Sequence, residues 1–283
     1  MIPERNFSRE SILERLRRRR EYGQPIVGVA AGVGIIAKFA EQGDADLIFV
    51  LSTSLSRNMG VPTTVTMGNA IDTTLGMYPE IDNIVERTPI VGGLEASDGT
   101  RRRVGRVVDQ YRRLGFDGVA NFPTLAAAPE NLAVRDDVGA GIVLEYDLVR
   151  EARARGMFAA AFVYNPRHAA PFVEAGADLV VARCGVTVGG LSGPIRGELS
   201  TEEELERIRA TCDQARAVDP DVLCLAQGGS LRTPDDLERV YANTDVDGVM
   251  CESSIERIPV EQAIQAEVEA FKALRLRTTA PIV

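Results

Sequence analysis

Glycine and serine residues that could bind an anion end two apolar stretches towards the C-terminal end of the chain. The stretch 222–229 ends in Gly228-Gly229, and the stretch 248–254 ends in Ser253-Ser254. A glycine pair lets backbone amides approach a ligand closely, and free amides at the start of a helix attract negative charge. Thr233-Pro234, after the glycine pair, is typical of a helix start. The pattern predicts a site for phosphate, sulfate or a carboxylate, and a plain tight turn is the alternative.

A single arginine at the end of another apolar stretch could bind a second anionic group. Arg183 stands two residues after Val181, so both side chains lie on the same side of a strand. If that side faces outward, a guanidinium is buried against helices at considerable cost. If it faces inward, the guanidinium can bind a carboxylate or phosphate through two parallel hydrogen bonds. The inward orientation is favoured, and an ion pair with a neighbouring glutamate is the structural alternative.

Carboxylates at comparable positions could act as bases or hold a metal ion. Glu95 and Glu252 end apolar stretches, and Glu145 stands at the start of a predicted helix. In such places a carboxylate can be a general base, a ligand of Mg²⁺ or the ion-pair partner of Arg183. No cofactor follows from the sequence itself, and Mg²⁺ is the one candidate that these carboxylates suggest.

Small and polar residues at further strand ends could complete the site. Ser52 is a natural hydrogen-bond donor to phosphate, and Gly32 would let the backbone approach a ligand. Amide and hydroxyl groups could orient an oxyanion or an enolate, and Asn121, Thr124 and Gln227 are placed for this role.

Histidine and lysine are scarce in the sequence, which argues against several kinds of chemistry. His168 is the only histidine, so a site with several histidine ligands to a metal is impossible, and a Ser-His-Asp triad could use only this residue. Lys38 and Lys272 are the only lysines, and both fall on predicted helices. A Schiff-base aldolase would need a lysine at a strand end, so that mechanism is disfavoured.

The charge and the cysteines restrict the partners and the compartment. The net charge of −9 argues against nucleic acid and anionic membranes as partners. No apolar run approaches the ~20 residues of a membrane span, and the first residues lack the pattern of a signal peptide. The four cysteines show no C-x-x-C spacing, so neither a zinc site nor a disulfide framework is indicated. We therefore expect a cytoplasmic protein whose partner is a small anionic metabolite.

The candidate residues lie in eight repeats of a strand followed by a helix. The expected strands cover 25–32, 46–52, 89–95, 118–123, 157–164, 179–183, 222–229 and 248–254, after a helix at 7–22. Eight such units favour a closed α/β fold, the (βα)8 TIM barrel with one extra N-terminal helix, over an open doubly wound sheet. We expect one domain over 1–283, with the leading helix in 1–22, the barrel in 23–275 and a tail in 276–283.

The connections differ in length at the two ends of the expected strands. The turns that enter strands are short and alike, whereas long loops at 53–68, 124–141 and 185–197 leave strands 2, 4 and 6. In a closed parallel barrel the active site lies at the carboxyl ends of the strands, and phosphate is often bound after strands 7 and 8. We therefore expect Ser52, Asn121, Glu145 and Arg183 to face one common cavity.

Several motifs resemble those of the phosphoenolpyruvate hydrolase-like TIM-barrel family, over about residues 11–274. The most specific are Asn121-Phe122-Pro123-Thr124 and Ser253-Ser254-Ile255-Glu256-Arg257-Ile258-Pro259. Gly185-Val186-Thr187-Val188-Gly189-Gly190 and the pair Gly228-Gly229 add to the resemblance. The family is itself similar to the C-terminal half of the plant Tm-1-type proteins.

The resemblance implies an enzyme, either a hydrolase or a lyase. It would act on a small phosphorylated or carboxylated oxo-acid and cleave a C–C, C–O or P–O bond through an enolate-like intermediate. Glu145 would be the base or a metal ligand, Asn121 would orient the substrate, and Arg183 would hold one anionic group. The second anionic group would lie at the glycine and serine pairs named above, and the glycine-rich loop would add Gly189 and Gly190.

The chain departs from the family pattern where proton transfer would be expected. The pattern has histidine at the end of strand 6 and before the glycine pair, where this chain has Arg183 and Gln227. Glu95 and Glu252 stand where smaller residues are common. Either the chemistry is rebuilt around Arg and Glu, or the barrel is a non-catalytic sensor or regulatory domain for a related anion. A homo-oligomer is expected in both cases, because an acidic surface does not account for apolar pieces such as 280–283.

Overall fold

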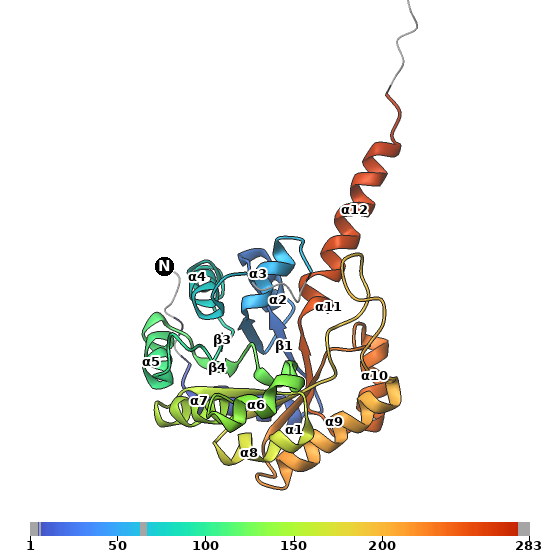
Figure 1. The fold of residues 1–283 in the computed structure, drawn as a ribbon. Helices are drawn as coiled ribbons and strands as arrows, with labels where there is room; N and C mark the ends of the chain where they lie inside the picture. Colours follow the sequence, from blue (N-terminus) through green and yellow to red (C-terminus); the bar gives the residue numbers. More distant parts are fainter. Residues whose placement is uncertain (1–4, 6, 63–66, 277–283) are drawn as a thin grey trace, which may run out of the picture.

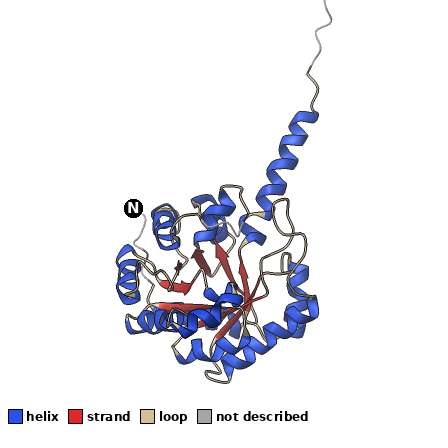
Figure 2. Cartoon of the chain, viewed as in Figure 1, coloured by secondary structure: helices blue, strands red, loops and turns tan. Residues whose placement is uncertain are grey.

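Eight parallel strands form a closed barrel (Figures 1 and 2). The computed structural model describes residue 5 and residues 7–62 and 67–276, so the apolar piece 280–283 lies outside the described residues. Each strand pairs with the next one in the chain and β8 pairs with β1, which confirms the predicted (βα)8 barrel and excludes the open sheet. The strands are β1 (Ile26–Ala30), β2 (Leu47–Val50), β3 (Ile90–Leu94), β4 (Gly118–Asn121), β5 (Phe158–Val163), β6 (Leu179–Arg183), β7 (Leu223–Gln227) and β8 (Gly248–Cys251).

Alternate residues of the strands fill the barrel interior. Phe49 and Phe162 meet there edge to face, with 6.0 Å between the ring centroids. Leu179 and Val181 belong to the same inner cluster, whereas their neighbour Val180 packs against the surrounding helices. Because side chains alternate along a strand, Arg183 must also point inward.

A helix ahead of the barrel closes its amino-terminal end. α1 (Arg9–Glu21) begins after Ser8, whose hydroxyl caps the helix. It buries Ile12, Leu13 and Leu16 against the inner residues of the barrel. The predicted leading helix is confirmed, and it seals the end of the barrel opposite the carboxyl ends of the strands.

Four aspartates fasten the strands at this closed end. Each immediately precedes an even-numbered strand and accepts a hydrogen bond, at 2.7–3.0 Å, from a backbone amide near the start of the preceding strand. They are Asp46, Asp117, Asp178 and Asp247, and their arginine partners are Arg19, Arg5, Arg9 and Arg216. Burial raises the pKa of the last three aspartates. The short, alike turns of the sequence therefore stabilise the barrel at the end away from the carboxyl ends of the strands.

Helices surround the barrel after each of the first seven strands. They are α2 (Gly34–Gln42), α4 (Ala70–Asp82), α5 (Val104–Leu114), α7 (Val143–Ala154), the turn η3 (Pro166–His168) with α8 (Ala169–Glu174), α9 (Thr201–Arg216) and α10 (Pro234–Asn243). Two predicted loops are not plain loops: α3 (Ser52–Asn58) occupies the first, and η1 (Leu125–Ala127), η2 (Pro129–Asn131) and α6 (Leu132–Asp137) occupy the second. These elements are too short to show a helical period in the sequence.

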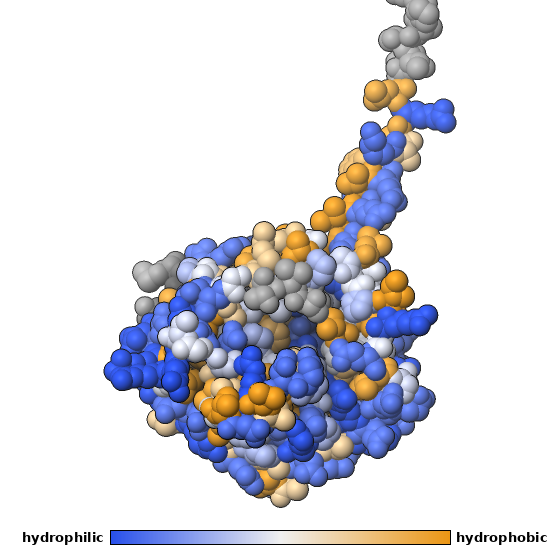
Figure 3. Space-filling view, in the orientation of Figure 1, coloured by the Kyte–Doolittle hydropathy of each residue, from blue (hydrophilic) through white to orange (hydrophobic). Residues whose placement is uncertain are grey.

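The helix after β8 does not cover the barrel. α11 (Ser253–Glu256) leads into α12 (Ile258–Ala273), which projects away from the body (Figures 1 and 3). No residue of α12 is buried. The helix predicted at this end is present, but it does not complete the ring. None of the described helices is long and apolar enough to cross a membrane.

Candidate functional site

A cavity of about 360 Å³ lies at the carboxyl ends of the strands, and we call it the mouth cavity. Its polar lining comes from the ends of β6 and β8 and from loops after other strands. These lining residues are Thr53, Thr124, Tyr164, Arg183, Thr187, Glu198, Glu252 and Ser253. Of the four residues expected to face one cavity, only Arg183 lines it, and Ser52, Asn121 and Glu145 do not.

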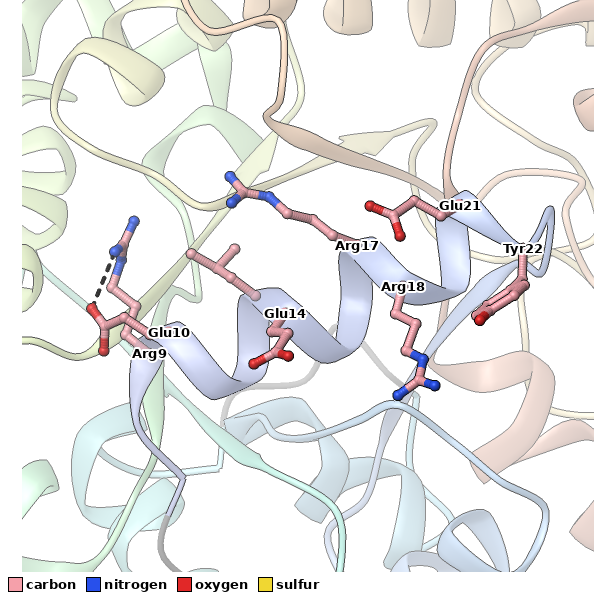
Figure 4. A pocket seen from close by; sticks show the side chains of 8 residues that line it. Arg9, Glu10, Glu14, Arg17, Arg18, Glu21 and Tyr22 are labelled. Atoms are coloured by element: carbon pink, nitrogen blue, oxygen red, sulfur yellow. Dashed lines mark hydrogen bonds and ion pairs between the residues drawn. The ribbon is translucent and has the colours of Figure 1, made fainter.

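A larger hollow of about 510 Å³ lies at the closed end of the barrel and is not a comparable site. Its lining belongs entirely to α1 and the residue after it, as Figure 4 shows. Arg9, Glu14 and Arg17 are charges of both signs on one helix face that is largely open to solvent. Function in such barrels lies at the other end, so volume alone does not identify the site.

Arg183 is held in the mouth by aromatic rings and one carboxylate. Its guanidinium carbon lies 4.9 Å from the centre of the Tyr164 ring and 5.5 Å from the centres of the Phe122 and Phe162 rings. Its Nη1 donates to Glu252 Oε1 at 2.9 Å. The Nε atom of this buried side chain has no partner among the described residues. A desolvated cation with a free donor is suited to an anionic ligand.

A second buried arginine shares the carboxylate of Glu252. Arg57 Nη1 lies 3.4 Å from Glu252 Oε2, and Arg57 Nε donates to Glu256 Oε2 at 2.6 Å. The other oxygen of Glu256 accepts from the backbone amide of Gly32 at 2.8 Å. The Gly32 amide, predicted to approach a ligand, is thus engaged within the protein. Each carboxylate of this cluster is surrounded by donors, as buried charges require.

Gln227 lies beside Arg183 in the register of β6 and β7. The side chain is 1% exposed and, by its alternation with Leu225, points into the barrel. Over the described part of the chain, neither its amide oxygen nor its amide nitrogen has a hydrogen-bond partner. Buried amides almost always have partners, so this one is suited to a water or a ligand group that both donates and accepts.

Glu145 lies behind the wall of the mouth cavity, not in it. Its carboxylate accepts from the Thr124 hydroxyl at 2.8 Å, from the Leu125 amide at 2.6 Å and from the Asn121 amide group. Burial raises its pKa to about 7, and the three donors oppose this rise. Asn121 itself is tied to the backbone of Phe162 in β5. These contacts hold the segment that supplies Phe122 and Thr124 to the cavity.

The glycine pair makes a close turn against the chain itself. Gly228 and Gly229 have φ of +86° and +58°, which favour glycine. A Cβ on Gly229 would lie 2.0 Å from Glu204 Oε1. That carboxylate accepts from the Ser230 amide at 2.8 Å and also from the Ser230 hydroxyl. An internal carboxylate therefore takes hydrogen bonds from the turn that the sequence assigns to an external anion.

The remaining predicted site residues lie around the mouth at different depths. Ser253 is buried and lines the cavity, whereas Ser254 is half-buried and outside its lining. Ser52 starts α3, and Glu95 is half-buried near the Ser97 hydroxyl at 3.4 Å, where burial raises the pKa of Glu95. In the loop after β6, the Gly189 carbonyl accepts from Arg257 at 2.9 Å, and a Cβ on Gly190 would meet the same arginine at 2.5 Å.

Some lining residues carried no clear signal in the sequence. Tyr164 directly follows β5 and could have been found by the same strand-end argument as Arg183. Thr53 and Arg57, the latter not in the lining but paired with Glu252, fall in a segment expected to be a loop, and Glu198 lies beyond a glycine-rich stretch. Segments of this kind show neither a helical nor a strand period, so the sequence does not indicate which of their residues reach the site.

Comparison with known sequences identifies a family and longer relatives. The family model described as Phosphoenolpyruvate hydrolase-like matches residues 11–274. The ToMV resistance protein Tm-1(GCR237) of Solanum lycopersicum is 33% identical over 279 residues, which are 97% of this chain and 37% of that protein. A putative transcriptional regulatory protein y4pA of Sinorhizobium fredii is 30% identical over 260 residues, 88% of this chain and 41% of that protein. The chain thus spans less than half the length of these relatives.

Solved structures share the fold at low sequence identity. A phosphonopyruvate hydrolase in complex with oxalate and Mg²⁺ has a TM-score of 0.59 at 19% identity, over 92% of this chain and 86% of that chain. An oxaloacetate acetylhydrolase in complex with the product oxalate has a TM-score of 0.59 at 15% identity, over 97% and 91%. At such identities these structures support the barrel fold alone.

Proposed function

The chain belongs to the phosphoenolpyruvate hydrolase-like family, and on that premise we propose that its mouth cavity binds and cleaves a small oxo-acid with a carboxylate group. The observation that carries the proposal is the buried guanidinium of Arg183, whose Nε is unpaired within the described residues. The bond cleaved would be a C–C, C–O or P–O bond next to the oxo or enol group. Proteins of similar fold are named for phosphonopyruvate and oxaloacetate, and two of them hold oxalate, which fits an anion of this size.

Each lining residue has a role in this proposal. Arg183 binds the carboxylate and stabilises negative charge that develops on the neighbouring oxygen. Thr124 and Ser253 offer hydroxyl groups from two sides of the cavity. Gln227 does not line the cavity, but it lies beside Arg183 in the register of β6 and β7, and its unpaired amide can accept or donate. Glu145 acts as a positioning residue, because its carboxylate holds the cavity wall and does not line the cavity.

A specific observation favours a second candidate function. Glu252, a carboxylate of the cavity lining, is paired with both Arg183 and Arg57, so both of its oxygens are already engaged within the protein. The remaining lining carboxylate, Glu198, is exposed at the rim. A barrel that binds the anion without turning it over, as a sensor or regulatory domain, would need no base. The cytoplasm stays the proposed compartment for either function, on the four free cysteines.

Product analysis separates these functions. The purified protein is incubated with oxaloacetate, whose C–C bond is cleaved by one water to give oxalate and acetate, and with phosphoenolpyruvate, whose P–O bond is cleaved by one water to give pyruvate and phosphate. We expect one of the two to be consumed, as followed by proton and phosphorus NMR. The control is Arg183→Met, which should abolish the turnover. Binding of either compound without any product would favour the sensor and contradict catalysis on these substrates.

We propose that the expected homo-oligomer forms through α12. In the ring of helices, a helix after β8 would lie between α10 and α2, but α12 projects away from the body and buries none of its residues there (Figure 1). On α2 this exposes Ile35 and Phe39, at 64% and 60%. Exposed apolar side chains of this kind mark an interaction surface.

The projecting helix carries the matching apolar stripe. Val260, Ile264, Val268 and Phe271 recur at helical spacing on α12, and all four are exposed (Figure 3). A lone helix of this length is marginal in water, so α12 needs a surface to pack on. A second copy offers an empty place for a helix, and two-fold symmetry lets each copy fill the place in the other.

A charge on the stripe is expected to break this oligomer. Light scattering after gel filtration should give at least twice the subunit mass for the parent and the subunit mass for Ile264→Glu. The matched control is Gln262→Glu, which adds the same charge to the opposite face of α12 and should keep the parent mass. A monomeric parent at micromolar concentration, or equal masses for both variants, would contradict the proposed interface.

A further inference from the structure

Two arginines supply positive charge at the mouth, where a metal ion could otherwise bind an anionic ligand. Arg183 and Arg57 both contact Glu252, at 2.9 and 3.4 Å, so two guanidinium groups meet at one buried carboxylate. Arg183 is further enclosed by the rings of Phe122, Phe162 and Tyr164. A divalent cation placed beside Glu252 would be repelled by both arginines at close range.

The carboxylates near the mouth do not fit Mg²⁺. Mg²⁺ usually takes one or two carboxylates together with waters and ligand oxygens. Glu252 is paired on both oxygens, Glu256 is bound to Arg57 and Gly32, and Glu145 is enclosed by donors behind the wall. Glu95 is half-buried beside the Ser97 hydroxyl and does not line the cavity, and Glu198 lines it at the exposed rim, so of the two carboxylates that line the cavity only Glu198 makes no described ion pair with an arginine. Among the described residues, no three acidic, histidine or cysteine side chains gather to hold a metal.

We infer that this mouth binds a carboxylate ligand directly on Arg183 and without a divalent metal ion. The inference rests on the proposed function and specifies how its ligand is held. Nη1 already donates to Glu252, so the unpaired Nε and the adjacent Nη2 form the planar edge that matches a carboxylate, and the guanidinium supplies both charge and orientation. The ligand class is therefore a small mono- or dicarboxylate that carries its oxo or enol oxygen towards Gln227.

Calorimetry with oxalate tests the inference without any need for turnover. Oxalate is titrated into the whole chain in EDTA and again in excess MgCl₂, at matched ionic strength and with the free oxalate concentration corrected for its complex with Mg²⁺. We expect the two dissociation constants to agree within about twofold. A titration of MgCl₂ alone should give no binding heat.

The variant Glu198→Gln separates the two modes by the sign of its effect. If Arg183 alone holds the ligand, removing a rim carboxylate should leave oxalate affinity unchanged or raise it, because a repulsion is lost. If the protein holds Mg²⁺, the same change should weaken binding in MgCl₂. Because Glu198 is exposed, the variant should fold like the parent.

The outcomes are distinct for the inference and for the proposed function. Binding that needs Mg²⁺, or is at least about tenfold tighter with it, overturns the inference alone and leaves the proposed ligand class standing. No binding under either condition overturns both. Equal binding in EDTA and MgCl₂, with no loss in Glu198→Gln, supports direct binding by the arginine.

Discussion

Replacing Arg183 with methionine is expected to weaken oxalate binding by about 30-fold to about 4,000-fold. Removing one partner of a buried, hydrogen-bonded charge pair costs about 2–5 kcal/mol, and each 1.4 kcal/mol is a factor of ten in affinity. Arg183 is 4% exposed and, among the described residues, is the only cation that lines the mouth cavity. Calorimetry at constant ionic strength measures the change directly.

Two controls give this result its meaning. Arg183→Lys keeps the positive charge but loses the planar fork, so it should recover only part of the affinity. Arg102→Met removes the same charge from an exposed arginine in another hollow, after β3, and should bind oxalate like the parent. Methionine at 183 stays among Phe122, Phe162 and Tyr164, so circular dichroism should show a folded protein. Parent-like affinity in folded Arg183→Met would contradict both the site and the metal-free mode.

The barrel could be predicted because each strand is a short apolar run closed by turn residues. The alternation of side chains then placed Arg183 correctly from Val181 alone, since both lie on β6 and point inward. The same alternation turns Asn121 the other way. Its neighbours Ala120 and Phe122 belong to the inner cluster, so Asn121 points outward and meets Glu145 on α7. The side chain of a residue at a strand end reaches the mouth only if it points to the inner side of the barrel.

Other features of the site depend on contacts between distant segments. Arg57 reaches Glu252 and Glu256 across about 200 positions of the chain, from a helix too short to be recognised by its period. Glu204 reaches the Gly228-Gly229 turn from α9, where the sequence shows only the acidic first turn of a helix. The helical period of α12 is visible in the sequence, but its direction away from the barrel is not. Such facts follow from packing, which a single sequence does not encode locally.

The carboxylate of Glu145 is expected to make the stability of this protein fall as the pH rises towards neutrality. Burial raises its pKa from the ordinary 4.5 to about 7 in the folded protein. Between these values the folded protein binds more protons than the unfolded chain, so the free energy of unfolding decreases with pH. The contribution of Glu145 is fully present below about pH 4.5 and is lost as the pH rises through 7. A shift of this size corresponds to about 3 kcal/mol.

The variant Glu145→Gln isolates this effect because glutamine does not titrate. Urea unfolding of parent and variant between pH 4.5 and 8 should show their difference in unfolding free energy changing by about 3 kcal/mol, to the disadvantage of the parent at high pH. Other buried carboxylates, such as Asp117 and Asp178, are present in both proteins and cancel in the difference. Glu206→Gln, an exposed change on α9, should give a flat difference.

The same variant, Glu145→Gln, tests whether Glu145 positions the wall of the mouth cavity or acts as a base. Its carboxylate holds Thr124 and the Leu125 amide, and Thr124 lines the cavity. Because a glutamine oxygen can still accept from the Leu125 amide, the wall should remain in place. Glu145→Gln should therefore bind oxalate within about tenfold of the parent, as loss of about one hydrogen bond predicts.

Two outcomes would contradict these expectations for Glu145. A difference in unfolding free energy between parent and variant that does not vary with pH would show that the three donors outweigh burial and keep Glu145 ionised. Unchanged oxalate affinity with complete loss of turnover would instead assign Glu145 as the base, and the positioning role would be wrong.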